Sequence, residues 1–136
     1  MTRLRIVVKL LGIAAAVVLP FFFSVPASAE KPSFAGVWKG TSLCQIKDSP
    51  CHDEGAVYTV KTGATPDSFE FSGNKVVEGK SIFMGLLECK PGSESDSLTC
   101  RQNESEWTWK LQGDSMNGTL MYRGQLYRKI TLTRAK

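Results

Sequence analysis

From residue 34 onward, apolar and polar side chains alternate over short stretches that are separated by turn residues. No stretch has the three- to four-residue period of an amphipathic helix. The alternation predicts strands over residues 36–44, 54–62, 67–73, 80–89, 97–102, 104–112, 115–123 and 125–134, with turns around Asn74, at Gly113-Asp114 and at Arg123-Gly124. Strands this short and this evenly spaced predict an all-β fold, either an antiparallel sandwich or a barrel.

The alternation also predicts which side chains face the core, because successive residues of a strand point to opposite faces. On the second strand this face continues back to Glu54, and on the last strand it includes Arg128 and Arg134. A buried charge needs a partner, so these three residues are the informative exceptions. The predicted core-facing apolar sets are Ala56, Tyr58 and Val60; Phe69 and Phe71; Trp107, Trp109 and Leu111; and Leu126, Ile130 and Leu132.

Closing the sheet is the simplest way to leave no strand edge exposed, and about eight strands suit a small barrel. We therefore expect a small antiparallel up-and-down barrel of about eight strands. Such a barrel is either filled by side chains or holds one small ligand. Several large aromatic residues point inward, so any cavity should be small.

The first 29 residues have a different pattern. Arg3, Arg5 and Lys9 flank the start of a long apolar run, which ends in Ala27-Ser28-Ala29. These are the features of a signal peptide with a small-residue cleavage site. We expect cleavage before Glu30, a single barrel domain over residues 30–136, and a periplasmic or secreted protein without a membrane anchor. The alternative is an uncleaved anchor, because the apolar run is nearly long enough to span a bilayer.

Loss of the signal peptide changes the meaning of the charge. It removes three of the 17 basic residues and none of the 13 acidic ones, which leaves a net charge of +1. The remaining Lys and Arg are scattered along the chain without a basic stripe. Nucleic acid is therefore not an expected partner.

Four cysteines, an even number, predict two disulfides in a small exported domain, with three possible pairings. We favour the local pairing, Cys44–Cys51 and Cys89–Cys100. The segment 89–100 looks like two strand ends that face each other across a turn, a geometry suited to a disulfide. A zinc site is the alternative, but the chain has one His and lacks tightly paired ligand spacings. We expect no metal and no cofactor.

Two segments resemble a known family. "FAGVWKG" is similar to the Gly-x-Trp signature that opens the first strand of lipocalins and their calycin relatives, and "YRKITLTR" resembles their last strand. More closely, "GVWKGTS", "CQIKDSPCHDE", "GDSMNGTL" and "LYRKITL" resemble short, uncharacterised bacterial secreted proteins with lipocalin-like barrels. The resemblance implies that Gly36 and Trp38 are the signature pair and that Arg134 packs over Trp38. The chain is shorter than standard lipocalins and lacks their other signature segments, so lipid binding is not inferred.

Antiparallel pairing of the last strand with the first places Arg128 near Cys44, at the other end of the barrel from Trp38. Glu54, Tyr58 and His52 belong to the same end. We expect these four residues to bind a small polar or anionic group, with Arg128 as a fork for a carboxylate. The alternative is that Arg128 and Glu54 form a purely structural ion pair.

The same region has little that favours catalysis. His52 could act as a base oriented by Asp53 or Glu54, but no recognised catalytic pattern surrounds Ser42 or Ser49. We expect a non-enzymatic monomer. A second hypothesis is a protein-binding module, such as an inhibitor of a secreted or cell-wall-active enzyme, which would use the loops at 45–54 and 90–97.

Overall fold

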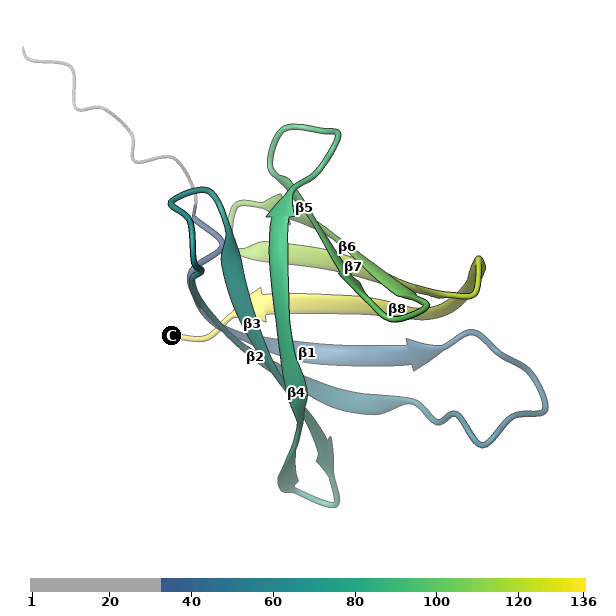
Figure 1. Ribbon diagram of the computed structural model, residues 1–136. Helices are drawn as coiled ribbons and strands as arrows, with labels where there is room; N and C mark the ends of the chain where they lie inside the picture. Colours follow the sequence, from purple (N-terminus) through teal and green to yellow (C-terminus); the bar gives the residue numbers. More distant parts are fainter. Residues whose placement is uncertain (1–32) are drawn as a thin grey trace, which may run out of the picture. The chain divides into compact units, whose positions relative to one another are not determined.

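The computed structural model describes residues 33–136, so the predicted signal peptide lies outside the described residues. Eight antiparallel strands form a closed barrel in which each strand pairs with the next and the last pairs with the first (Figure 1). The all-β, up-and-down barrel predicted from the alternation is confirmed. Between residues 33 and 136 there is no helix that is long and apolar enough to cross a membrane. The strands are β1 (Gly36–Cys44), β2 (Glu54–Thr62), β3 (Phe69–Val77), β4 (Lys80–Pro91), β5 (Ser97–Gln102), β6 (Ser105–Gln112), β7 (Ser115–Tyr122) and β8 (Gln125–Arg134).

The predicted turn at Asn74 is wrong. β3 continues through Asn74 to Val77, and the chain reverses at Glu78 and Gly79, whose φ angles are +50° and +76°. Asn74 pairs with Phe83 of β4 and its amide donates a hydrogen bond to the Ser81 hydroxyl at 2.9 Å. Pairing with β4 therefore overrides the preference of Asn for turns. A β-bulge lies beside it, where the register shifts between Gly73 and Asn74.

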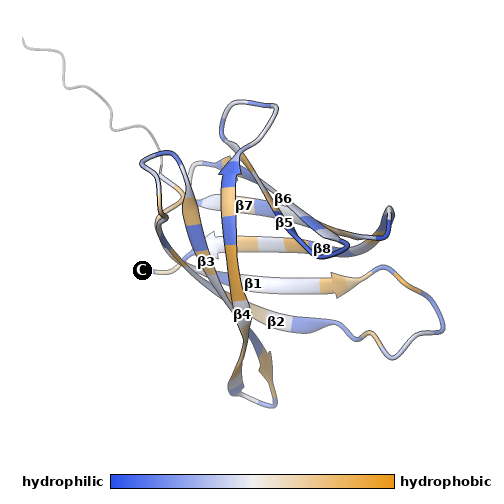
Figure 2. Ribbon diagram, viewed as in Figure 1, coloured by the Kyte–Doolittle hydropathy of each residue, from blue (hydrophilic) through white to orange (hydrophobic). Residues whose placement is uncertain are grey.

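The barrel interior is filled at its centre by aromatic rings. Trp109 stacks on Phe71 with the ring centroids 5.0 Å apart, and Tyr58 meets Trp109 edge-on at 5.0 Å. Gly118 lies opposite Trp109 on β7, and a Cβ at this position would overlap the indole ring. The alternation of apolar and polar residues along the strands is visible in Figure 2. The buried apolar residues are Phe34, Trp38, Ala56, Val60, Phe71, Cys89, Leu98, Cys100, Trp109, Leu111, Met116, Ile130 and Leu132.

One end of the barrel is closed by Trp38, which is fully buried and donates from its indole nitrogen to the Phe34 carbonyl at 2.8 Å. Arg134 lies over the Trp38 ring and donates to the carbonyls of Ala35 and Ser33 at 2.8 and 2.7 Å. Gly36 has a φ of +135°, and a Cβ there would lie 2.8 Å from the Arg134 guanidinium. Glycine is thus required by both the backbone conformation and the close approach of Arg134.

The structure contains two disulfides, Cys44–Cys51 and Cys89–Cys100, which is the pairing that the sequence favoured. The second disulfide has a particular place in the barrel. β4 and β5 share only three residue pairs, of which Cys89 with Cys100 is the first. This is the shortest ladder of the barrel, and the disulfide reinforces it with a covalent link between the two strands.

The face predicted for the last strand holds only in part. Ile130 and Leu132 are buried on the inner face, and Arg128 precedes them at the same spacing. The register of β7 and β8 then shifts between Leu120 and Met121, so that Leu126 pairs with Met121. Because a one-residue shift exchanges the two faces of a strand, Leu126 does not continue the inner face.

Candidate functional site

Arg128 occupies the end of the barrel opposite Trp38. It pairs across the β1–β8 ladder with Cys44, as the antiparallel arrangement predicted. Its side chain is 15% exposed and that of Glu54 is 19% exposed. The two side chains form an ion pair, with Arg128 Nη1 and Glu54 Oε1 3.4 Å apart. Two of the three inward charges identified in the sequence, Arg128 and Glu54, therefore pair with each other, and both side chains are mostly buried.

A single nitrogen of Arg128 makes all of its polar contacts. Besides Glu54, Nη1 donates to the Ser42 hydroxyl at 3.2 Å, to the Ser42 carbonyl at 3.4 Å and to the His52 carbonyl at 3.1 Å. The Nε and Nη2 atoms have no hydrogen-bond or ion-pair partner within residues 33–136. Arg128 thus connects β1, the following loop and β2, and still has donors to spare.

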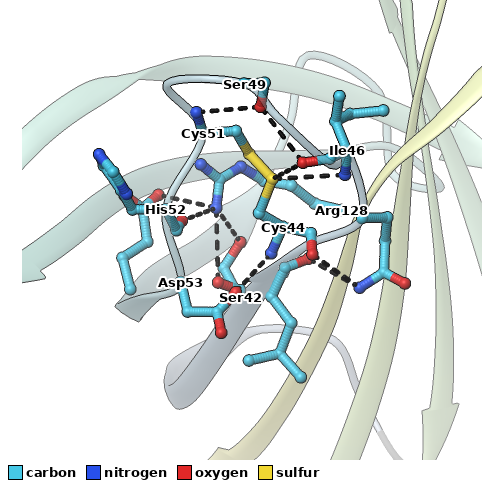
Figure 3. Close-up of a disulfide and its surroundings, with 11 residues drawn as sticks. Ser42, Cys44, Ile46, Ser49, Cys51, His52, Asp53 and Arg128 are labelled. Carbon is cyan, nitrogen blue, oxygen red and sulfur yellow. Dashed lines mark hydrogen bonds and ion pairs between the residues drawn. A yellow bond between two sulfur atoms is a disulfide. The ribbon is translucent and has the colours of Figure 1, made fainter.

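The loop above Arg128 is held by short-range interactions (Figure 3). The Cys44–Cys51 disulfide closes it, and the Cys44 amide donates to the Asp53 carboxylate at 2.8 Å. The Gln45 amide donates to the Tyr127 carbonyl at 2.9 Å, which ties the loop to β8. The rim of the barrel is therefore pre-organised. The consecutive residues Cys51, His52, Asp53 and Glu54 form the part of this loop that leads into β2.

The open end of the barrel around Arg128 is called the mouth below. The imidazole of His52 does not take part in it. The residue is exposed, and it contacts Arg128 through its backbone carbonyl. Among the described residues the ring makes no hydrogen bond to a hydroxyl or to Asp53, whose carboxylate accepts from the Cys44 amide instead. A general base needs to lie within hydrogen-bond reach of the proton that it removes. Within residues 33–136 the His52 ring has no hydroxyl partner that it could deprotonate in this way.

Below the rim lies a hollow of about 180 Å³ inside the barrel. Its polar lining includes Arg128, Glu54 and Tyr58, as expected from the sequence, together with Lys75. Apolar residues are also part of the lining. The lining residues are Ser42, Glu54, Ala56, Tyr58, Gly73, Asn74, Lys75, Met84, Trp107, Leu120, Arg128 and Ile130.

A second hollow of about 100 Å³ adjoins the first along the side of the barrel. The two share Tyr58, Gly73, Met84 and Trp107, and the second also reaches Leu86 and Gln102. The side hollow lies where β4 has parted from β5, because these strands pair only near Cys89. The mouth therefore has an end opening and a side extension.

Tyr58 separates the aromatic core from the hollow. Burial raises the pKa of its phenol to about 12; the Arg128 charge lowers it and the Glu54 charge raises it, both less strongly than burial. The phenol is therefore neutral at any physiological pH and is available as a donor. Gly73 lies beside the ring, where an added Cβ would be 3.0 Å from Tyr58 Cε1, so glycine makes room for this orientation.

Lys75 was not predicted from the sequence to face the interior of the barrel. It lies opposite Ala56, which is 5% exposed, so it belongs to the inner face of β3. The alternation Phe69, Phe71, Gly73, Lys75 would have shown this, but the prediction of a turn at Asn74 ended the strand too early. Among the residues that the structure describes, the Lys75 ammonium has no ion-pair or hydrogen-bond partner.

Larger depressions lie on the outside of the molecule. One of about 520 Å³ over β5 and β6 carries Lys110 and Glu94, which form an ion pair, and Arg101 and Glu106, which form another. These charges satisfy each other. Within residues 33–136 no group of three His, Cys, Asp or Glu side chains is placed to hold a metal ion.

The molecule is thus a small closed antiparallel barrel with one arginine-bearing hollow in its interior. No family model matches the sequence, and no curated protein matches it significantly.

Proposed function

We propose that this protein is an exported, non-enzymatic barrel of the lipocalin-like type that binds a small polar or anionic molecule at the Arg128 mouth. The observation that carries the proposal is the incomplete use of Arg128. Its Nη1 is fully engaged, while Nε and Nη2 lack partners among the described residues in a side chain that is 15% exposed. These two donors are not shielded from solvent, so a ligand at the open end can reach them, and a guanidinium with free donors in a mostly buried side chain favours an anionic partner.

The neighbours of Arg128 support an anion of modest size. Lys75 adds a second positive charge and the Tyr58 phenol adds a neutral donor, whereas Glu54 alone is acidic. The hollow of about 180 Å³ corresponds to the liquid volume of about six water molecules. A carboxylate of amino-acid size therefore fits this space better than a lipid. Trp107, Leu120 and Ile130 would contact its apolar part.

Three further features agree with the proposal. Gly36, Trp38 and Arg134 have the arrangement that the resemblance to lipocalin-like proteins implies at the closed end. Two disulfides are compatible with a periplasmic or extracellular location. The imidazole of His52 is exposed and makes no hydrogen bond to a hydroxyl among the described residues, so it gives no support to a catalytic role.

The test is native mass spectrometry of the protein recovered from its natural compartment, followed by titration with acetate, succinate and inorganic phosphate. Additional mass on the native protein would identify the ligand. Arg128→Lys keeps the charge but removes the guanidinium fork, and we expect a loss of affinity of about tenfold or more. Lys75→Met should also weaken anion binding without removing a contact of the fold. Arg101→Ala is the matched control, because Arg101 is exposed on the outer face and pairs with Glu106.

If the native protein carries no ligand and none of the three anions binds, the proposal fails. It also fails if Arg128→Lys and Lys75→Met bind anions as well as Arg101→Ala does. Arg128→Ala is less informative on its own, because it removes the connections to Ser42 and His52 together with the binding group.

A second candidate is a protein-binding module. The disulfide-closed loop at 45–50, fixed by the hydrogen bonds of Cys44 and Gln45, is a pre-organised surface of the kind that binding proteins use. An inhibitor of a secreted or cell-wall-active enzyme would rely on residues 45–54, which include this loop, and on the loop at 90–97. His52→Ala and Asp53→Ala would then abolish binding to the partner, whereas Lys75→Met would leave it unchanged.

A further inference from the structure

The barrel closes its sheet everywhere except along β4. From Lys80 to Glu88 this strand pairs with β3 on one side, and its ladder with β5 begins only at Cys89. Within residues 33–136, no strand pairs with residues 80–87 on the other side. The β3–β4 hairpin projects beyond the rest of the barrel in Figure 1. A free strand edge of this length can pair with a further strand.

The free edge is also apolar. Residues 81–87 carry no charge, and the side chains of Phe83 and Met84 are each 60% exposed. Leu86 and Ile82 follow at 48% and 43%. Figure 2 shows this stretch as part of the orange region of the projecting hairpin. Proteins usually protect such edges with charges, proline, a bulge or a covering segment, and of these the described residues show only the bulge at Met84 between Ser81 and Leu87.

The β-bulge decides which side chains share a face. Leu87 and Gly85 lie opposite Phe71 and Gly73 on the inner face, and the register skips Met84 before it resumes with Phe83 opposite Asn74. Because of this skip, Phe83 and Leu86 lie on the outer face and Ile82 lies on the same face as Leu87.

We propose that two copies of the chain associate through this edge, with their β4 strands antiparallel around a twofold axis between Met84 and Gly85. In this register, Phe83 of each copy lies opposite Leu86 of the other on the outer face. Ile82 likewise lies opposite Leu87 of the other copy on the inner face. All four apolar positions therefore find apolar partners on matching faces, and a shift by one residue would destroy the match.

Two arguments favour a second copy over a strand from another protein. The apolar positions of the edge are self-complementary about this axis, because the bulge at Met84 places Phe83 and Leu86 on one face and Ile82 and Leu87 on the other. The twofold contact also uses the free edge of both copies at once, so that assembly stops at a dimer. The proposed dimer differs from the monomer that we expected from the sequence. It does not depend on ligand binding at Arg128.

The contact would also change the side hollow. Met84 and Leu86 line it, and both belong to the proposed interface. A second copy would therefore cover the side extension of the mouth and leave the end opening beside Arg128.

The test is sedimentation velocity over a range of concentrations, on protein expressed from the full sequence and recovered as the host processes it. We expect a dimer for the parent and a monomer for Phe83→Asp and for Leu86→Asp. Phe83 is 60% and Leu86 48% exposed, and neither belongs to the buried core, so neither substitution disturbs it. Leu43→Asp is the matched control, because Leu43 is 43% exposed on β1 and should remain dimeric. Hydrogen exchange should show protected amides in residues 81–87 of the parent and at least tenfold faster exchange in both variants.

A parent that stays monomeric at the highest concentration reached would overturn the proposal. So would a dimer that survives both substitutions, or one that Leu43→Asp abolishes equally, because the contact would then lie elsewhere. Near-ultraviolet circular dichroism equal to that of the parent verifies that each variant is folded.

Discussion

Arg134 and Trp38 face each other across the β1–β8 ladder, with the guanidinium carbon 4.2 Å from the centroid of the indole ring. The cation–π contact and the hydrogen bonds to Ala35 and Ser33 fix the start of the described chain to its end. These contacts of Arg134 hold the closed end of the barrel together, at the end opposite the mouth.

Replacing Arg134 by Ala should lower the free energy of unfolding by about 2 kcal/mol, since a cation–π contact and hydrogen bonds are lost together. Arg134→Lys should recover only part of this, because an ammonium cannot contact the ring, Ala35 and Ser33 at once. Chemical denaturation followed by tryptophan fluorescence measures both. Ligand binding at Arg128 should be unaffected, and an equal loss of binding would contradict the separation of the two ends.

The two disulfides should differ in how easily they are reduced. Cys89 and Cys100 are 0% and 1% exposed, whereas Cys44 and Cys51 lie at the partly exposed rim. A mild reductant should therefore open Cys44–Cys51 first. Alkylation of the new thiols followed by peptide mass mapping would show the order, and simultaneous opening would contradict the prediction.

Removal of each disulfide should also have a different structural result. Cys44→Ala with Cys51→Ala should destabilise the protein by roughly 2–3 kcal/mol, chiefly through the unfolded chain, and leave the barrel closed. Cys89→Ala with Cys100→Ala removes a similar constraint and in addition the link across the three-pair ladder of β4 and β5. Amides of β5 should then exchange faster than those of β7, and uniform exchange would count against a special role for this link.

The raised pKa of Tyr58 predicts a loss of stability in alkaline solution. The unfolded phenol ionises near pH 10.0 and the folded one near 12, so between these values the folded state holds more protons than the unfolded state. The contribution of Tyr58 is therefore complete below about pH 10 and is lost as the pH rises to about 12. The loss amounts to at most about 2–3 kcal/mol. Tyr58→Phe should flatten this part of the curve of unfolding free energy against pH, and an unchanged slope would refute the assignment.

Gly118 should tolerate no side chain. A Cβ would overlap the indole of Trp109, so Gly118→Ala is expected to cost about 1–3 kcal/mol of stability. The cost should shrink in a Trp109→Phe background, because the smaller ring makes room. The indole nitrogen of Trp109 is buried without a hydrogen-bond partner among the described residues, so Trp109→Phe removes no hydrogen bond. A double-mutant cycle of thermal unfolding measures the coupling, and additive effects would contradict it.

Alternation and turn residues were sufficient to predict most of the barrel, because one face of each strand is buried and the other is not. The failures occur where a strand departs from regular pairing. Asn74 has the local chemistry of a turn, yet cross-strand pairing with β4 keeps it extended. Leu126 follows the alternation in the sequence, but the bulge near Leu120 moves it out of phase. Bulges depend on the partner strand, and a single strand's pattern does not contain that information.

The mouth was predicted in outline for the same reason. Arg128 and Glu54 stood out because each is a charge in phase with an apolar face, and the structure brings them within 3.4 Å. His52 was included because of its position in the chain, but the direction of a loop side chain depends on the hydrogen bonds of the loop. The parting of β4 from β5, which opens the side of the barrel, depends on the lengths of two ladders and had no signal in the sequence.

The pairing of β1 with β8 has a consequence for the connectivity of the fold. Because Trp38 and Arg134 are direct neighbours, the start of β1 and the end of β8 lie close enough to be joined by a short linker. The chain could then be cut at the exposed Glu78–Gly79 turn, and the same eight strands would form in a circularly permuted order. The order of strands along the chain is therefore separable from the barrel that they build.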